Sequence, residues 1–311
     1  MSGLGGKRTL ANVVFHLPSF PVVIHFPGGR EAKGDSAMAT VVNTPVGEVE
    51  RRDLLSGTPR AGFIDRWIFV FTAASFIAIV LAGFIPDSLM KIAMVEAGQR
   101  PPFPLVMHAH AVLMGSFLLL LLAQTWLMAT GRRAFHMQLG LLAIVLAPAL
   151  VVVGFALVPT MYYETWSALQ SAPPEARAKL QELLTIKENI MLLQLRVGIL
   201  FPLFLAIGLR ARGRNAGIHK RMMILATVMA MPAGIDRIPW LAHTMPASPL
   251  SPDLYTLLAV APMFLWDVLR NRWIHPAYVI WLAINIPFAI AVHGLWDTDW
   301  WHQTARQIMG V

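Results

Sequence analysis

The sequence predicts an all-α integral membrane protein, a polytopic bundle of seven transmembrane helices with the N-terminus inside and the C-terminus outside. Of the 311 residues, 56% are hydrophobic and only 14% are charged, whereas soluble domains carry about 25% charged residues. Apolar segments near the length that crosses a bilayer, about 20 residues in a helix, recur along the chain. These observations together exclude an ordinary water-soluble globule.

Seven apolar segments are expected to form the spans. The fifth holds Asp236 and Arg237 in its last third, and the sixth is short and ends in Asp267, so these two are the weakest candidates. The expected spans are residues 67–85, 105–129, 137–159, 189–209, 222–241, 254–269 and 274–295.

The charges of the short loops predict the orientation. One set of loops is rich in arginine and lysine, and the alternate set is mainly acidic. Basic loops remain in the cytoplasm, which places the N-terminus inside and the C-terminus outside a bacterial-type inner membrane. The formal net charge of +8 has the same explanation, so we expect membrane lipid and no nucleic acid as a partner. Most of the ten tryptophans lie near predicted span ends, where indole rings favour the headgroup level.

Two regions outside the spans differ in character. Residues 1–60 are rich in glycine, proline and small polar residues, and we expect a mostly disordered cytoplasmic segment, with Met38 as an alternative start, before a transmembrane domain over 61–311. The outer loop 160–189 contains an amphipathic stretch, 173–186, which is typical of a helix lying on the membrane surface. The absence of cysteine excludes disulfides, iron–sulfur clusters, covalently attached c-type haem and cysteine nucleophiles.

The histidines form two layers on this topology. The expected inner layer is His136, His219 and His275, and the expected outer layer is His108, His110, His243 and His293. Imidazoles at both ends of a bundle fit two stacked b-type haems, because each iron takes axial nitrogens from facing helices. Small residues such as Gly140, one turn after His136, would leave room for a porphyrin. Two alternatives remain open: histidines with no metal role above ordinary helix-packing stripes, and a non-haem metal site.

Charged residues inside the spans are a second indication of a site, because an ionisable group in the bilayer costs free energy unless it is paired or hydrated. Arg196 and Arg237 are candidates for holding haem propionates, a quinone oxygen or an anionic substrate. The alternative is an ion pair between Arg196 and Asp236 that ties two helices together. Asp267 is expected to form a solvated pair with Arg270.

Two short stretches carry a resemblance to a known class of protein. Gly131-Arg-Arg-Ala-Phe-His136-Met-Gln-Leu-Gly140 and His219-Lys-Arg-Met-Met223, with Arg237 downstream, resemble uncharacterised bacterial multi-span membrane proteins that are distantly similar to the dihaem, ascorbate-type b cytochromes. The resemblance covers roughly residues 105–240 and implies His136 and His219 as inner ligands and His110 as an outer one. The chain departs from those cytochromes in having seven expected spans rather than six.

A second seven-span family, the membrane zinc hydrolases related to ceramidases and adiponectin receptors, shares the expected topology. Those enzymes need a His-x-x-x-His pair on the last span. The last span here has only His293, and Ala289 stands at the paired position. The sequence therefore argues against a zinc hydrolase.

The sequence as a whole favours a b-type haem protein that passes electrons between a quinone-like donor and an outer acceptor, such as another membrane redox protein. Its predicted metal ligands to haem b are His110, His136, His219 and His293, and its predicted cofactor-binding residues also include Gly140, Arg196 and Arg237. The alternative function is a non-redox transporter or accessory membrane protein whose histidines and arginines line a polar cavity.

Overall fold

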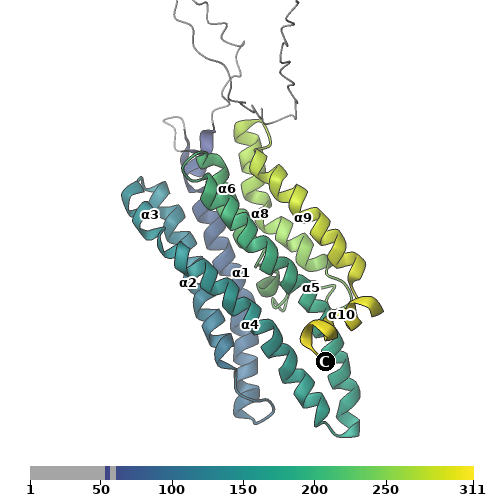
Figure 1. Ribbon diagram of the computed structural model, residues 1–311. Coiled ribbons are helices and arrows are strands. Elements are labelled where there is room, and N and C mark those ends of the chain that lie inside the picture. Colours follow the sequence, from purple (N-terminus) through teal and green to yellow (C-terminus); the bar gives the residue numbers. More distant parts are fainter. Residues whose placement is uncertain (1–52, 57–60) are drawn as a thin grey trace, which may run out of the picture. The chain divides into compact units, whose positions relative to one another are not determined.

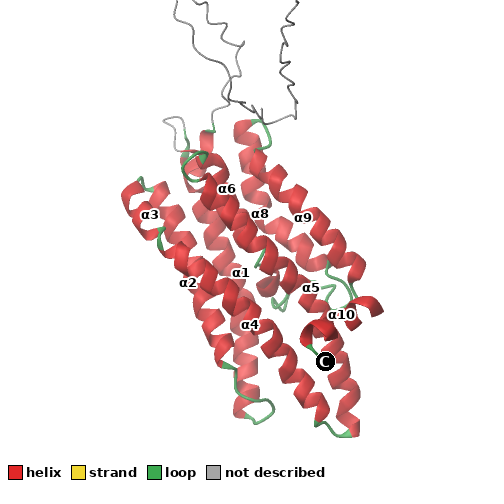
Figure 2. Cartoon of the chain, viewed as in Figure 1, coloured by secondary structure: helices red, strands yellow, loops and turns green. Residues whose placement is uncertain are grey.

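The chain folds into a helical bundle, shown in Figures 1 and 2. The computed structural model describes residues 53–56 and 61–311, and this part of the chain is helical and contains no strand. The predicted disordered segment 1–60 therefore lies almost wholly outside the described residues. A short 3₁₀ helix, η1 (Leu54–Ser56), precedes the bundle.

Six helical segments among the described residues are long and apolar enough to cross a membrane, with mean hydropathies between 1.3 and 2.9. They are α1 (Phe63–Glu96), α2 (Leu105–Ala129), the consecutive helices α3 (Arg133–Leu139) and α4 (Leu142–Gln170), α5 (Pro174–Ala211), α8 (Leu250–Asn271) and α9 (Pro276–Leu295). The prediction of an all-α membrane bundle is confirmed at this level.

The fifth expected span, 222–241, is not one helix, so the prediction of seven transmembrane helices is corrected. The chain instead forms α6 (Ala216–Val228) and α7 (Pro232–Ile235), separated by a buried break in which the Met231 amide bonds the Val228 carbonyl at 3.0 Å. Pro232 explains the break, because proline lacks the amide hydrogen that the helix would need there. A helix of 13 residues spans only about 20 Å, less than the bilayer core of about 30 Å.

The expected surface helix at 173–186 is the first part of α5. That helix runs without interruption for 38 residues, about 57 Å, so it extends well beyond the thickness of the bilayer core. Prolines at its start, Pro173 and Pro174, favour a helix N-terminus at this point. The connection between α4 and α5 is accordingly short.

The apolar side chains divide between a packed interior and an exposed exterior. The largest buried cluster includes Phe76, Phe204 and Met222, from α1, α5 and α6. A second cluster joins α5 to the amphipathic C-terminal helix α10 (Asp299–Met309) through residues such as Trp301. Large side chains such as Leu105 and Val145 are 82% and 72% exposed, far more than a soluble surface tolerates as a contiguous layer. Lipid is the solvent that suits this exterior.

Candidate functional site

Two predicted ligands, His136 on α3 and His219 on α6, face each other. Their ring centroids are 6.3 Å apart and the ring planes cross at 81°. His136 Nδ1 lies 3.3 Å from the backbone carbonyl oxygen of Gln124, and His219 Nδ1 lies 2.8 Å from the backbone carbonyl oxygen of Gly208. A carbonyl oxygen only accepts hydrogen bonds, so each Nδ1 carries the hydrogen, and the Nε2 atoms are left with free lone pairs.

Glycines allow the helices to approach closely around this pair. A Cβ at Gly208 would lie 3.1 Å from Met222 Cβ and 3.3 Å from Met223 Sδ, so a glycine lets α6 pack tightly against α5. A Cβ at Gly140, the predicted small residue, would lie 3.0 Å from the His136 carbonyl oxygen and 3.4 Å from Gln124 Nε2. Both glycines therefore belong to the surroundings of the imidazole pair.

Gln124 places an unsatisfied amide beside the same pair. Its side-chain nitrogen and oxygen are both buried, and neither has a hydrogen-bond partner among the described residues. A buried amide without partners is costly and calls for an explanation. A polar group of a bound ligand would provide one.

The surroundings of His219 favour its neutral form. Burial lowers the pKa of His219, and the nearby cationic Arg212 lowers it further, against the opposing effect of the hydrogen bond to Gly208. A neutral imidazole is the form that binds a metal. Arg133 and Arg212 are exposed, and neither forms an ion pair in the part of the chain that the structure describes.

The predicted outer ligands, His110 and His293, have separate surroundings. His110 on α2 lies against Gly154 of α4, and its Nδ1 is buried without a partner among the described residues. His293 on α9 places Nε2 3.0 Å from Asp253 Oδ2 on α8. Figure 1 shows α2 and α9 on opposite sides of the bundle. The structure therefore does not bring these two histidines together as it does His136 and His219.

Arg196 does not pair with Asp236, and this prediction is wrong. The Arg196 guanidinium lies 2.6 Å from Asp253 Oδ1 and donates to Asn285 Oδ1 at 3.0 Å. Asp236 lies near His243 instead, at 3.6 Å. Asp236 lies inside the expected span 222–241, but the break after α6 removes that span.

Arg237 is likewise placed away from the imidazole pair. Its Nε lies 3.4 Å from Asp87 Oδ2 on α1, and its guanidinium lies 4.8 Å from the centre of the Phe84 ring. Arg196 and Arg237 thus both have protein partners of their own.

A small cavity, the size of a water molecule, adjoins Arg196 at the break between α6 and α7. Polar groups reach it from α5 and α8, and the remaining lining is apolar. Its lining residues are Leu193, Arg196, Val197, Met229, Pro232, Asp253 and Thr256. This cavity is a second interior position with polar side chains, distinct from the imidazole pair.

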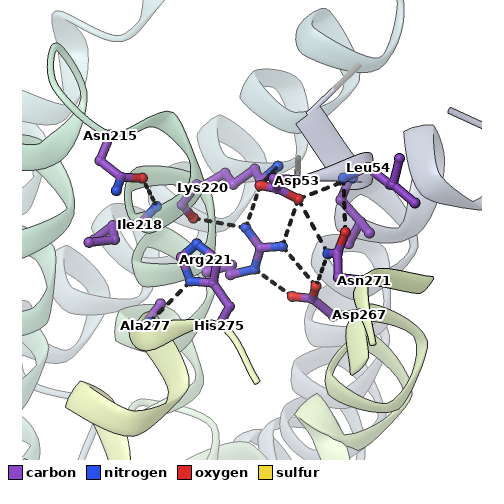
Figure 3. A network of polar contacts seen from close by, with 12 residues as sticks. Asp53, Leu54, Asn215, Ile218, Lys220, Arg221, Asp267, Asn271, His275 and Ala277 are labelled. Atoms are coloured by element: carbon purple, nitrogen blue, oxygen red, sulfur yellow. Dashed lines mark hydrogen bonds and ion pairs between the residues drawn. The ribbon is translucent and has the colours of Figure 1, made fainter. Parts of the chain in front are cut away.

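An ionic network that sequence reasoning missed fixes the start of α6 (Figure 3). Arg221 is fully buried between two carboxylates: it donates to Asp267, with one bond of 2.8 Å, and to Asp53 at 2.8 and 3.0 Å. Asp267 also accepts from Tyr278 at 2.8 Å. The expected pair between Asp267 and Arg270 is wrong, because Arg270 bonds Asp65 at 2.7 Å. In the sequence, Arg221 is one of the basic loop residues that predict the orientation, and no local pattern indicates that it is buried.

Another buried carboxylate holds the C-terminal helix. Glu188 on α5 is fully buried and accepts from His302 at 2.8 Å and from Arg306 at 2.9 Å. Trp301 Nε1 donates to the Glu188 carbonyl at 2.7 Å. These contacts hold α10 against α5. They give His302 and Arg306 a protein partner, so the two side chains need no ligand.

Comparison with known proteins adds no family: no protein-family model, no curated protein and no solved structure matches the chain. Among the described residues, no three histidine, cysteine, aspartate or glutamate side chains gather into a group that could hold a metal ion. The imidazole pair thus offers two protein ligands, which suits a metal whose other ligands come with it.

Proposed function

We propose that this chain is a membrane-bound b-type haem protein in which His136 and His219 would hold one haem. The observation that carries the proposal is the mutual placement of the two rings, 6.3 Å apart at 81°. When bound, a haem supplies one-electron chemistry, and electron transfer is the function we infer.

The spacing of the rings suits a single metal ion between them. Two imidazoles with ring centres 6.3 Å apart could both reach one metal ion, because metal–imidazole bonds are about 2.0–2.1 Å long. Each ring also has the support expected of a ligand, because metal-bound histidines donate their other N–H to a carbonyl or carboxylate. The Gln124 and Gly208 carbonyls accept in that way.

The neighbouring residues of the pair suit the edges of a porphyrin. The unsatisfied Gln124 amide is a hydrogen-bond donor beside Gly140. Arg133, at the start of α3, and Arg212, at the end of α5, are the nearby cations without protein partners among the described residues, and we assign them to the propionates in place of Arg196 and Arg237. A quinone-like donor dissolved in the bilayer and an outer electron acceptor complete the proposal.

Absorbance spectroscopy of the purified protein tests the proposal. Protein from haem-replete cells should show a Soret band, and His136→Ala and His219→Ala should each remove the same haem, because losing either ligand disrupts one site. His108→Ala, at an exposed position on α2, is the matched control and should retain it. Colourless wild-type protein, or full haem content in the His136 variant, would overturn the proposal.

A second function, a non-redox transporter or accessory protein, is favoured by a different observation. Broken helices that line a polar cavity are typical of transporter binding sites, and the break after α6 adjoins Arg196 and Asp253. Under this function the protein would be free of haem, and solute flux into vesicles would depend on Arg196 but not on His136.

A further inference from the structure

The segment that precedes α1 reaches across to the helix that carries His219. Asp53 lies just before η1, and its carboxylate bonds Arg221 on α6 at 2.8 and 3.0 Å. It also lies 2.8 Å from Lys220 Nζ. Lys220 and Arg221 directly follow His219, so Asp53 holds the first turns of α6 from outside the bundle's helices (Figure 3).

The opposite side of Arg221 is held by α8. Asp267 binds the same guanidinium, and Asn271 donates to Asp267 at 2.7 Å. Asn271 also accepts the Leu54 amide at 2.9 Å. The buried guanidinium thus lies between two carboxylates that are themselves fixed, and removal of one partner of a buried ion pair leaves an uncompensated charge.

Close packing restricts the start of α6 in addition to this network. A Cβ at Gly217 would lie 2.7 Å from His275 Nε2 and 3.2 Å from Asp53 Oδ2, so α6 packs directly against both. The helix is only 13 residues long and ends at the break. A rotation or shift at its start would therefore move the His219 ring, which belongs to the same turn as Arg221.

We propose that Asp53 is a positioning residue for His219: through Arg221 and Lys220 it sets the orientation of α6 that brings the imidazole opposite His136. The consequence for haem rests on the proposed function, whereas the consequence for the placement of α6 does not. The segment before α1 would then be part of the imidazole site, although it contributes no ligand.

Two measurements on Asp53→Asn test the proposal. The first is haem affinity, which should fall roughly tenfold, the lower end of the loss seen when residues that orient metal ligands are changed. The second is the distance between spin labels on Phe135→Cys and Ala216→Cys, two exposed positions beside His136 and His219 in a chain that contains no other cysteine. The distance distribution should broaden or shift.

Asp65→Asn is the matched control. Asp65 is a buried carboxylate that binds Arg270 at 2.7 Å and the Trp266 indole at 2.9 Å. It therefore links α1 to α8, and within the described part of the chain it forms no ion pair with α6. The control should leave the label distance and the haem affinity unchanged at a comparable loss of melting temperature. Equal effects of the two variants on both measurements would overturn the proposal.

The two proposals fail in different ways. If wild-type protein binds no haem but Asp53→Asn still broadens the label distances, the haem function is wrong and the positioning of α6 by Asp53 stands. If wild-type protein binds haem but the label distances and the affinity are unchanged in Asp53→Asn, the positioning role is wrong and the haem site stands.

Discussion

Arg196 of α5 and Asp253 of α8 form an ion pair of 2.6 Å inside the bundle, and Asn285 of α9 accepts from the same guanidinium. The Arg196 residue is only 5% exposed. His293 lies on the other oxygen of Asp253. Three helices are therefore joined at one charge, next to the break in the fifth expected span.

We first predict that loss of Asp253 alone costs far more than loss of both members of this pair. Asp253→Leu should lower the free energy of unfolding by about 3–5 kcal/mol, because it leaves the buried Arg196 charge without its ion-pair partner. Arg196→Met should cost less, because the half-buried Asp253 keeps His293 beside it. The double variant should recover much of that loss in a double-mutant cycle measured by denaturant titration. Additive losses would show that the two residues do not interact.

A second prediction concerns the contact between α1 and α7. A Cβ at Gly83 would lie 2.0 Å from the Gly234 carbonyl oxygen, so Gly83→Ala must push backbone away from backbone. We expect a loss of about 1–3 kcal/mol in the free energy of unfolding, as for other overpacked interiors. Gly115→Ala on α2, where a Cβ meets nothing within 4 Å, is the control and should cost nothing. Equal stability of the two variants would contradict the close approach.

A third prediction is a pH dependence at His275. This side chain caps α9 by accepting the Ala277 amide, and burial, followed by the nearby Arg221 charge, lowers the pKa of His275 from 6.5 to about 4. Between pH 6.5 and 4 the unfolded chain binds a proton that the folded chain does not. The free energy of unfolding should therefore fall by about 3 kcal/mol as the pH drops across this range.

The measurement that checks it is thermal or denaturant unfolding of wild-type protein and His275→Asn at pH 7 and pH 4.5. Asparagine keeps a capping oxygen but does not titrate, so the variant should lose much of the difference between the two pH values. An unchanged difference would assign the pH dependence to other groups.

The fourth prediction is the orientation in the membrane, which depends on the charge bias of the loops. A reporter fused after Val311 should be active only outside the cytoplasm, and one inserted at Gly213, between α5 and α6, should be active only inside. This outcome requires the broken segment from α6 to α8 to cross the bilayer. The Arg221–Asp267 pair joins the start of α6 to the end of α8, so reporters at Gly213 and after Val311 that are active on the same side would contradict the fold. An outer Gly213 with a cytoplasmic Val311 would invert the orientation.

The sequence by itself determined the membrane class, the helical fold and most helix positions. Apolar runs must be helical in lipid because every backbone group has to bond within its own segment, so α2 and α9 could be located closely from composition alone. The sequence also singled out His136 and His219, because each opens an apolar segment beside small residues. What these features share is that they depend on neighbours within a few turns of the chain.

Only the tertiary structure decided which distant residues meet. The partner of Arg196 is Asp253 rather than Asp236, and the partner of Asp267 is Arg221 rather than Arg270. Spacing along one chain cannot give such pairs, because they depend on the rotation and depth of separate helices. The break at Pro232 had a larger effect still: it ends α6 after 13 residues, and the start of this short helix is bonded to Asp53, a residue outside every apolar segment.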